Sequence, residues 1–368
     1  MNEKTQPCTH CGAVHPRVNL TWMGSAELCP ECLQRYTVCC DCCGERIWMA
    51  NDYGTHYLHL CASCRADNYV TCENCGALIP QEDAHYNDED EAYCDSCYER
   101  GYGGTIHNYS YKPEPIFYGD GPLYLGVELE VDEAGKDNIN AVQALRAFNQ
   151  ENVYGYVKSD GSLNDGFELV THPCTLETHL QQVPWRETLE ALRGMGYRSH
   201  APGTCGLHVH VSRKALGKDV YEQEETIAKL LYIFERFWQE ILRFSRRTES
   251  QINHWAARYG YKDRGEEILK EAKHGANGRY ACINLTNTDT IEFRVFRGTL
   301  KYNTVIATLQ FVANLCRVAI SLPEYRIQEF SWPALIEALT QDNSPELVQY
   351  LKERNLYVNE PVTAERDV

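Results

Sequence analysis

Four short segments of the chain place charged or imidazole side chains at every second residue. They are Val127-Glu128-Leu129-Glu130-Val131, Phe167-Glu168-Leu169-Val170, Gly206-Leu207-His208-Val209-His210-Val211-Ser212 and Ile291-Glu292-Phe293-Arg294-Val295. Because successive side chains of a strand point to opposite faces, each segment predicts a strand with one apolar and one polar face. If the four strands share a sheet, one side of it carries four carboxylates, two imidazoles and a guanidinium. We therefore expect a polar basin suited to divalent metal ions and a polyphosphate.

Carboxylates two residues apart on one strand, joined by an imidazole from another strand, are ligands of the kind that hold Mg²⁺ or Mn²⁺ beside nucleotide phosphates. The candidate ligands are Glu128, Glu130, Glu168, His208 and Glu292. The alternative is that each polar face simply meets solvent, where Glu and Arg are ordinary residues. That alternative weakens when four strands share the pattern, because like charges on one face repel unless a cation neutralises them.

A second set of chemically active residues lies at the start of the chain, where 14 of the 18 cysteines precede residue 98. Three Cys-x-x-Cys-Gly motifs recur at intervals of 32 residues, and each is followed by a second Cys-x-x-Cys pair. Four thiolates in this arrangement enclose one tetrahedral zinc ion, so the repeat predicts three structural zinc sites. Their ligands would be Cys8, Cys11, Cys29 and Cys32; Cys40, Cys43, Cys61 and Cys64; and Cys72, Cys75, Cys94 and Cys97.

Two alternatives for the cysteines stay open. A disulfide framework would require an oxidising compartment, which nothing else in the sequence indicates. In the second repeat, Cys39 and Cys42 form a competing pair, although the 32-residue spacing favours Cys40 and Cys43. Residues 1–110 hold 6 Lys or Arg against 16 Asp or Glu, a net charge of −10. Such a segment repels nucleic acid, so we expect the zinc array to recognise a protein or peptide.

The whole chain of 368 residues has a net charge of −17 and is 43% apolar, enough for two or three domains. No apolar run approaches the roughly 20 residues that cross a membrane, and residues 1–4 lack a signal-peptide pattern. We expect a soluble, cytoplasmic protein with no membrane partner. Its predicted parts are a zinc array over residues 1–100, a linker rich in Gly, Pro and Tyr over 101–121, and an α+β domain over 122–368.

Helices must pack on the apolar face of the predicted sheet. The pattern favours continuous helices over residues 176–195 and 222–246, the second with an aromatic stripe at helical spacing. Residues 249–279 look irregular and carry many basic side chains, among them Arg258 and Arg279. They predict either a basic lid over the site or a solvated loop.

Five motifs in this order resemble the amidoligase family over about residues 120–320. They are Gly126-Val127-Glu128-Leu129-Glu130, Lys158-Ser159-Asp160-Gly161-Ser162, Gly166-Phe167-Glu168-Leu169-Val170-Thr171-His172-Pro173, Cys205 through Ser212, and Thr290-Ile291-Glu292-Phe293-Arg294. Amidoligases are carboxylate-amine ligases with the catalytic fold of glutamine synthetase and glutamate-cysteine ligase. The resemblance implies a curved antiparallel sheet, packed by helices, whose concave face holds ATP and divalent cations. The zinc array lies outside it.

The resemblance also implies roles for individual residues. Glu128, Glu130, Glu168, His208 and Glu292 would bind magnesium, and Asp160 and Ser162 would lie in the loop beside the acceptor substrate. The nucleotide would be contacted by His210, Ser212, Arg279, Lys158 and Arg294, with Arg294 at the transferring phosphate.

The implied reaction activates a carboxylate with ATP as an acyl phosphate, which an amine then attacks to form an amide or isopeptide bond. A protein or peptide recruited by the zinc array is the expected substrate, while the acid and the amine stay unidentified. Two alternatives remain: a phosphotransferase of the same fold, and a zinc-binding adaptor whose ligase domain is inactive.

Overall fold

The computed structural model describes residues 5–87, 90–99, 104–274 and 278–358. The chain divides into two compact units, Met1–Gly104 and Thr105–Val368. The segment 101–121, predicted as a linker, is only partly described, and two parts of it pair with strands of the second unit. Residues 101–103 lie outside the described residues, whereas Ile106–His107 forms strand β11 of the second unit and Tyr118 pairs with Cys174.

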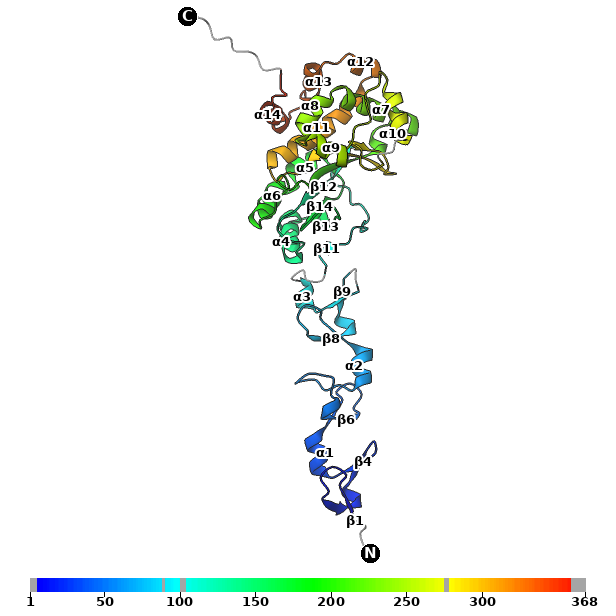
Figure 1. Ribbon diagram of the computed structural model, residues 1–368, viewed down its shortest axis with the longest axis vertical. Coiled ribbons are helices and arrows are strands. Elements are labelled where there is room, and N and C mark those ends of the chain that lie inside the picture. Colours follow the sequence, from blue (N-terminus) through cyan, green and yellow to red (C-terminus); the bar gives the residue numbers. More distant parts are fainter. Residues whose placement is uncertain (1–4, 88–89, 100–103, 275–277, 359–368) are drawn as a thin grey trace, which may run out of the picture. The chain divides into compact units, whose positions relative to one another are not determined.

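The first unit contains three repeats, each with one or two short antiparallel hairpins followed by a helix (Figure 1). Its strands are β1 Thr5–Pro7, β2 Val14–Pro16, β3 Thr21–Met23, β4 Ala26–Leu28, β5 Thr37–Cys39, β6 Arg46–Trp48, β7 Tyr69–Thr71, β8 Leu78–Pro80, β9 His85–Tyr86 and β10 Ala92–Tyr93. Its helices are α1 Pro30–Tyr36, α2 Ala62–Asn68 and α3 Asp95–Glu99. The glycine after each first pair, such as Gly12, has a positive φ, the conformation that this tight turn requires.

Consecutive repeats share their cores. Helix α1 ends at Tyr36 and strand β5 begins at the next residue, so no linker separates the first repeat from the second. Trp48 of the second repeat packs against the core formed by Cys8, Leu28, Cys29 and Cys32 of the first. In the same way, Leu78 of the third repeat packs against the cysteine core of the second. The repeats therefore fold as one interlocked body.

The second unit is built on an eight-stranded sheet. Along its main path the strand order is β11-β13-β14-β12-β16-β18-β17, and β15 pairs with β12. The strands beyond β11 are β12 Tyr124–Val131, β13 Gly155–Lys158, β14 Phe167–Thr171, β15 Cys174–Thr175, β16 Gly206–Ser212, β17 Ile283–Asn284 and β18 Thr290–Arg297. All pairs are antiparallel except β11 with β13, which is parallel. The α+β class is confirmed, with this one parallel edge as a departure from a purely antiparallel sheet.

The register of the strands gives the sheet two chemically different faces. Leu125, Val127, Leu129 and Val131 of β12 are fully buried in the helix-packed core. On the other face, Glu128 is paired across the strands with His208, and Glu130 with Glu168. His210 is paired with Glu292. The alternation read from the sequence thus carries the charged residues to one side of one sheet.

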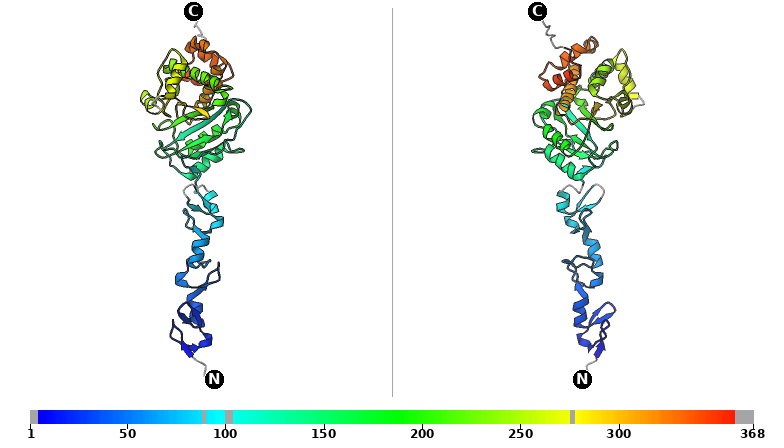
Figure 2. Two further views of the ribbon diagram at one scale, coloured as in Figure 1. Left: turned by 90° about the vertical axis from the view of Figure 1, so that its right-hand side faces the viewer. Right: turned by 60° about the vertical axis from the view of Figure 1, so that its left-hand side comes forward.

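Helices cover the apolar face and continue beyond it (Figure 2). They are α4 Asn138–Phe148, α5 Leu176–Gln181, α6 Trp185–Gly194, α7 Val220–Arg236, α8 Trp238–Ser245, α9 Glu249–Trp255, α10 Gly265–His274, α11 Tyr302–Ser321, α12 Glu324–Gln328, α13 Trp332–Leu339 and α14 Pro345–Glu353. By length and composition α11 could cross a membrane, contrary to the expectation from the sequence. It is mostly buried within this unit, as a core helix is.

Three helix predictions are corrected by the structure. The helix expected over 176–195 is interrupted before Pro184, because the proline ring disfavours helix at the residue preceding it. The helix expected over 222–246 breaks at Phe237, where φ −104° and ψ 33° leave the helical region. The segment 249–279, expected to be irregular, contains α9 and α10. Thr248 begins α9 with a capping box completed by Gln251.

Candidate active site

His208 lies at the centre of the polar face. Its Nδ1 atom is 3.2 Å from Oε2 of Glu128, 3.8 Å from Oε1 of Glu130 and 3.6 Å from Oε1 of Glu292. The four side chains come from the adjacent strands β12, β16 and β18. The sequence motifs that contribute them are far apart in the chain, and the sheet brings them together.

Glu128 belongs to two groups of three donors that could each hold a cation. One group is Glu128, His210 and Glu292, and the other is Glu128, Glu168 and His208. Within each group the ligand atoms lie within 4.8 Å of one another. Carboxylate oxygens with one imidazole suit a hard divalent cation. His210, expected only beside the nucleotide, is therefore also placed where it could contact a cation.

The carboxylate of Glu130 is oriented by the backbone. Its Oε2 accepts a hydrogen bond from the backbone N–H of Gly206 at 2.5 Å. A side chain at position 206 would collide with the His208 ring, because an added Cβ would lie 2.4 Å from its Nε2. Gly206 thus permits the close approach of Glu130 and His208.

The electrostatics of the carboxylates reflect their crowding. Burial raises the pKa of Glu168 well above its usual value; repulsion from Glu128 adds to the rise, which Lys158, 3.3 Å away, only partly offsets. Burial likewise raises the pKa of Glu130. For Glu128 burial also acts upward, but His210 and His208 outweigh it and hold its pKa well below the usual value. A divalent cation would allow all these groups to be ionised together.

Glu292 is held on both sides. Asn284 donates from Nδ2 to its Oε2 at 2.8 Å, and Arg294 forms an ion pair with its Oε1. The Glu292 and Asn284 side chains are almost completely buried. Asn284 was not predicted as a site residue, because a single Asn on a short strand carries no sequence signal. Its position opposite Glu292 in the β17–β18 pair explains its role.

The remaining predicted residues are more dispersed. Asp160 accepts a hydrogen bond from the backbone N–H of Ser162 at 2.7 Å, so it shapes the loop after β13. Ser212 lies at the end of β16, paired with Thr290. Arg279 donates to the hydroxyl of Tyr280 at 2.8 Å and is also bonded to the Tyr109 hydroxyl. The Tyr109 ring lies 5.6 Å from Nζ of Lys158, which connects Arg279 to the edge of the site.

Four basic side chains of segment 249–279 are engaged in ion pairs, those of Arg258, Lys262, Arg264 and Lys273. Arg258 pairs with the buried Glu235 at 2.7 Å, and Lys262 pairs with Glu271 at 3.2 Å. Lys273 is paired with Glu224. These partners neutralise four of the cations, whereas Arg279 is bonded to the hydroxyls of Tyr109 and Tyr280. The described part of the segment contains helices α9 and α10, so it is not the irregular loop that the sequence predicted.

The three predicted cysteine sets are each gathered in the first unit. In the second repeat the set consists of Cys40, Cys43, Cys61 and Cys64, while Cys39 and Cys42 are exposed outside it. The Sγ atoms of Cys11 and Cys29 are 3.8 Å apart, and the matching pairs in the other repeats are 3.9 and 3.8 Å apart. Zn–S bonds of about 2.3 Å give a tetrahedron with edges of about 3.8 Å, so each set fits a zinc ion.

Backbone groups favour the thiolate form at the first cysteine of each set, as they do at Cys8 and Cys40. Burial raises the pKa of Cys8, but the N–H groups of Cys11, Cys29 and His10 outweigh it and lower the pKa to about 6. The N–H groups of Cys43 and Cys61 lower the pKa of Cys40 to about 6. Burial and neighbouring thiols raise the pKa of Cys32, and neighbouring thiols and burial raise that of Cys64, so metal binding at these sets still releases protons.

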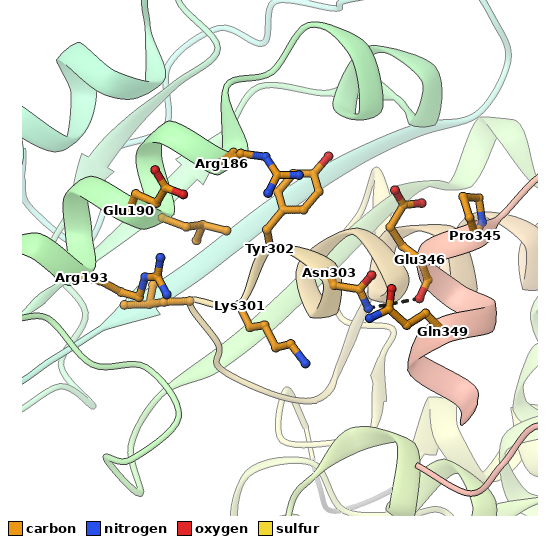
Figure 3. A pocket seen from close by; sticks show the side chains of 11 residues that line it. Arg186, Glu190, Arg193, Lys301, Tyr302, Asn303, Pro345, Glu346 and Gln349 are labelled. Carbon is orange, nitrogen blue, oxygen red and sulfur yellow. Dashed lines mark hydrogen bonds between the residues drawn. The ribbon is translucent and has the colours of Figure 1, made fainter. Parts of the chain in front are cut away.

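A separate cavity of about 470 Å³ lies among α6, α11 and α14. Figure 3 shows Arg186 and Arg193 on one side of it and Glu346 and Gln349 on the other. The Arg186 guanidinium is 4.0 Å above the Tyr302 ring. None of the carboxylates around His208 lines this cavity, so it is distinct from the polar face.

Comparison with known proteins gives one family and two distant structures. Residues 146–316 match the family described as "Putative amidoligase enzyme". A bifunctional glutathione synthetase from Pasteurella multocida is similar at 15% identity and a TM-score of 0.32, over 63% of this chain and 46% of that chain. The complex between the Prokaryotic Ubiquitin-like Protein Pup and its ligase PafA is similar at 10% identity and a TM-score of 0.29, over 63% and 62%. No curated protein sequence matches.

The chain spans less than two thirds of the length of either structure. The similarity to the amidoligase family rests on the family match and the motifs. The matched segment includes four of the five motifs, those that contain Asp160, Glu168, His208 and Glu292. The fifth motif, with Glu128, precedes it and is paired with the His208 strand. Residues 146–316 of the second unit thus match the amidoligase family model, and the strand that carries Glu128 pairs with this matched segment.

Proposed function

We propose that the protein is an ATP-dependent carboxylate-amine ligase that forms an amide or isopeptide bond through an acyl phosphate. The observation that carries this proposal is the pair of three-donor groups that share Glu128 on one face of the sheet. A carboxylate is a poor electrophile, and a site that performs this reaction must bind phosphates and cations before the amine attacks. The family match supports the same class of reaction.

The side chains around His208 would bind the cations that this reaction requires. Glu128, Glu130, Glu168, Glu292 and His208 would hold two divalent cations, with Glu128 shared between them. When bound, these Mg²⁺ or Mn²⁺ ions would neutralise the charge that develops on the transferring phosphoryl group. The carboxylates are positioned before binding, because neighbouring strands and backbone donors fix them.

Arg294 supplies a fixed positive charge beside this cluster. Its pairing with Glu292 orients the guanidinium, and Asn284 holds Glu292 from the other side. A guanidinium oriented in advance stabilises a transferring phosphoryl group without reorganising during the reaction. Lys158 is paired with Glu168 in a similar way, so it contributes charge to the opposite edge of the cluster.

The zinc array is proposed to recruit a protein or peptide that carries the acid or the amine. Its acidity supports a partner with basic groups rather than nucleic acid. A cytoplasmic location belongs to the proposal, because twelve zinc-binding thiolates persist in a reducing compartment.

The ligase proposal is tested by release of ADP and phosphate. Because the acid and amine are unknown, the assay uses pools of amino acids and peptides with Mg²⁺ and ATP, and mass spectrometry identifies the condensed product. Release should require both an acid and an amine, and Glu128→Gln should abolish it. Glu151→Gln, which changes an exposed carboxylate, should retain activity. A stable phosphorylated product without free phosphate would instead identify a phosphotransferase.

A further inference from the structure

A cluster of arginines lies at the Gly206 end of the polar face. Arg297 is the cross-strand partner of Gly206, so the two residues face the same side of the β16–β18 pair. A Cβ added to Gly206 would lie 2.9 Å from Nη2 of Arg247, which places that guanidinium directly beside Gly206. Arg294 lies on the same strand as Arg297.

These guanidinium groups are incompletely paired. Within the described part of the chain, the Nε atoms of Arg247, Arg294 and Arg297 are buried and have no hydrogen-bond partner. The Arg247 residue is only 6% exposed, and its recorded side-chain hydrogen bond is to the Phe296 carbonyl at 3.3 Å. Buried donors of this kind are rarely left unpaired, because each lost hydrogen bond is costly.

The positive charges also repel one another. Burial lowers the pKa of Arg247 to about 10; Glu130 opposes the decrease, while Arg294, Arg297 and Arg246 add to it. Glu130 is the carboxylate that opposes this decrease, and its Oε2 also accepts a hydrogen bond from the backbone N–H of Gly206. Arg294 is paired with Glu292, whereas within the described residues Arg247 and Arg297 form no salt bridge with a carboxylate.

We propose that Arg247 and Arg297, together with Arg294, form an oxyanion subsite that binds a carboxylate or phosphate group next to the metal cluster. Guanidinium groups are suited to this role because their parallel N–H donors match the two oxygens of such an anion. Two sources share this chemistry: a second anionic group on the acid substrate, or a phosphate of the nucleotide. The choice of substrate depends on the proposed ligase function, whereas anion binding itself does not.

The test is isothermal titration calorimetry on the full chain in a low-salt buffer free of phosphate and sulfate. The probes are glutarate, butyrate and inorganic phosphate, each with and without Mg²⁺ and a non-hydrolysable ATP analogue. The test variant is Arg297→Gln, which changes the half-buried member of the cluster. The control is Arg186→Gln, because Arg186 lies in the separate cavity of Figure 3. Thermal denaturation confirms that both variants are folded.

Saturable binding of glutarate or phosphate is expected, with at least about tenfold weakening in Arg297→Gln, as expected for loss of charge-assisted hydrogen bonds. Arg186→Gln should bind like the wild type. Binding that persists beside the nucleotide analogue assigns the subsite to the acid substrate, and competition assigns it to a phosphate. The subsite proposal fails if no probe binds, or if both variants weaken binding equally. Probe binding without any binding of the Mg²⁺–nucleotide analogue would instead overturn the ligase proposal and leave the subsite standing.

Discussion

His208 on β16 faces Glu128 on β12 directly across an antiparallel strand pair, with 3.2 Å between Nδ1 and Oε2. This pairing joins the two motifs on which the site depends. Because Glu128 is also 3.2 Å from Nε2 of His210, a single carboxylate connects both imidazoles of the His-x-His strand. The site is therefore a continuous network, and a change in one carboxylate should affect cation binding throughout.

Neutralising Glu168 should raise the stability of the metal-free protein and lower the additional stabilisation that Mg²⁺ gives. Its pKa is raised by burial and by Glu128, so its ionised form destabilises the folded protein at neutral pH. Glu168→Gln should therefore stabilise the metal-free protein at pH 7, and it should reduce the increase in melting temperature caused by Mg²⁺. The measurement is thermal denaturation with EDTA and with Mg²⁺. Equal Mg²⁺ effects in wild type and variant would exclude Glu168 as a ligand.

The cysteines of the second repeat offer a matched comparison. Cys40→Ser removes a member of the four-sulfur set, whereas Cys39→Ser changes the adjacent exposed thiol. Elemental analysis should give three zinc ions per chain for the wild type and for Cys39→Ser, and two for Cys40→Ser. Loss of zinc from Cys39→Ser, with retention in Cys40→Ser, would reverse the assignment of the pair.

The shared cores of the array can be tested with two tryptophans. Trp48 packs against the cysteine core of the preceding repeat, whereas Trp22 is 62% exposed. Trp48→Ala should destabilise the array by about 1–3 kcal/mol, less than for a fully buried tryptophan, and should speed zinc loss from the first repeat to a chelator. Trp22→Ala should have little effect on either quantity. If Trp48→Ala changes neither the stability of the array nor the rate of zinc loss from the first repeat, the repeats fold separately.

His179 should make the second unit sensitive to acid. Its Nε2 is 3.1 Å from the Leu125 carbonyl and its Nδ1 accepts from Trp185, so both nitrogens are satisfied in the neutral ring. Burial lowers its pKa to about 4. Its contribution to stability is therefore fully present above about pH 6.5 and is lost as the pH falls to about 4, by roughly 3 kcal/mol.

The matching measurement is chemical denaturation at pH 7 and pH 4. His179→Gln can keep one hydrogen bond without binding a proton, so its loss of stability between these pH values should be smaller than that of the wild type by about that amount. An equal loss in both proteins would assign the acid sensitivity to other groups.

Much of the fold was predictable because alternation is a local signal. The apolar and polar residues alternate along β12 and β16, and in β18 they alternate from Thr290 to Val295, so both these strands and their polar face could be predicted. The helix breaks were harder to predict. Phe237 interrupts a hydrophobic stripe that continues on both sides of it, and only tertiary packing selects the break. The pairing of Ile106–His107 with β13 is also non-local and has no pattern of its own.

The residues of the candidate site could be predicted from the sequence only where they belong to one of the short motifs. Asn284 contributes through its strand partner Glu292, and Arg247 through its approach to Gly206. Both relationships depend on contacts between segments that are distant in the sequence. Conversely, the basic residues of 249–279 looked functional in the sequence. In the structure Arg258 is paired with Glu235 of α7 and Lys262 with Glu271 of α10.

The joined repeats have a practical consequence for dissecting the array. A fragment that stops at Asn68, the end of the helix that carries Cys64, would lack Leu78, which packs against the cysteine core of the second site. A fragment that continues through Pro80 would include it. The smallest fragment that folds by itself is thus longer than the segment between its first and last zinc ligands. Protease digestion in the presence of zinc should therefore leave fragments that extend to about Pro80 rather than ending at Asn68.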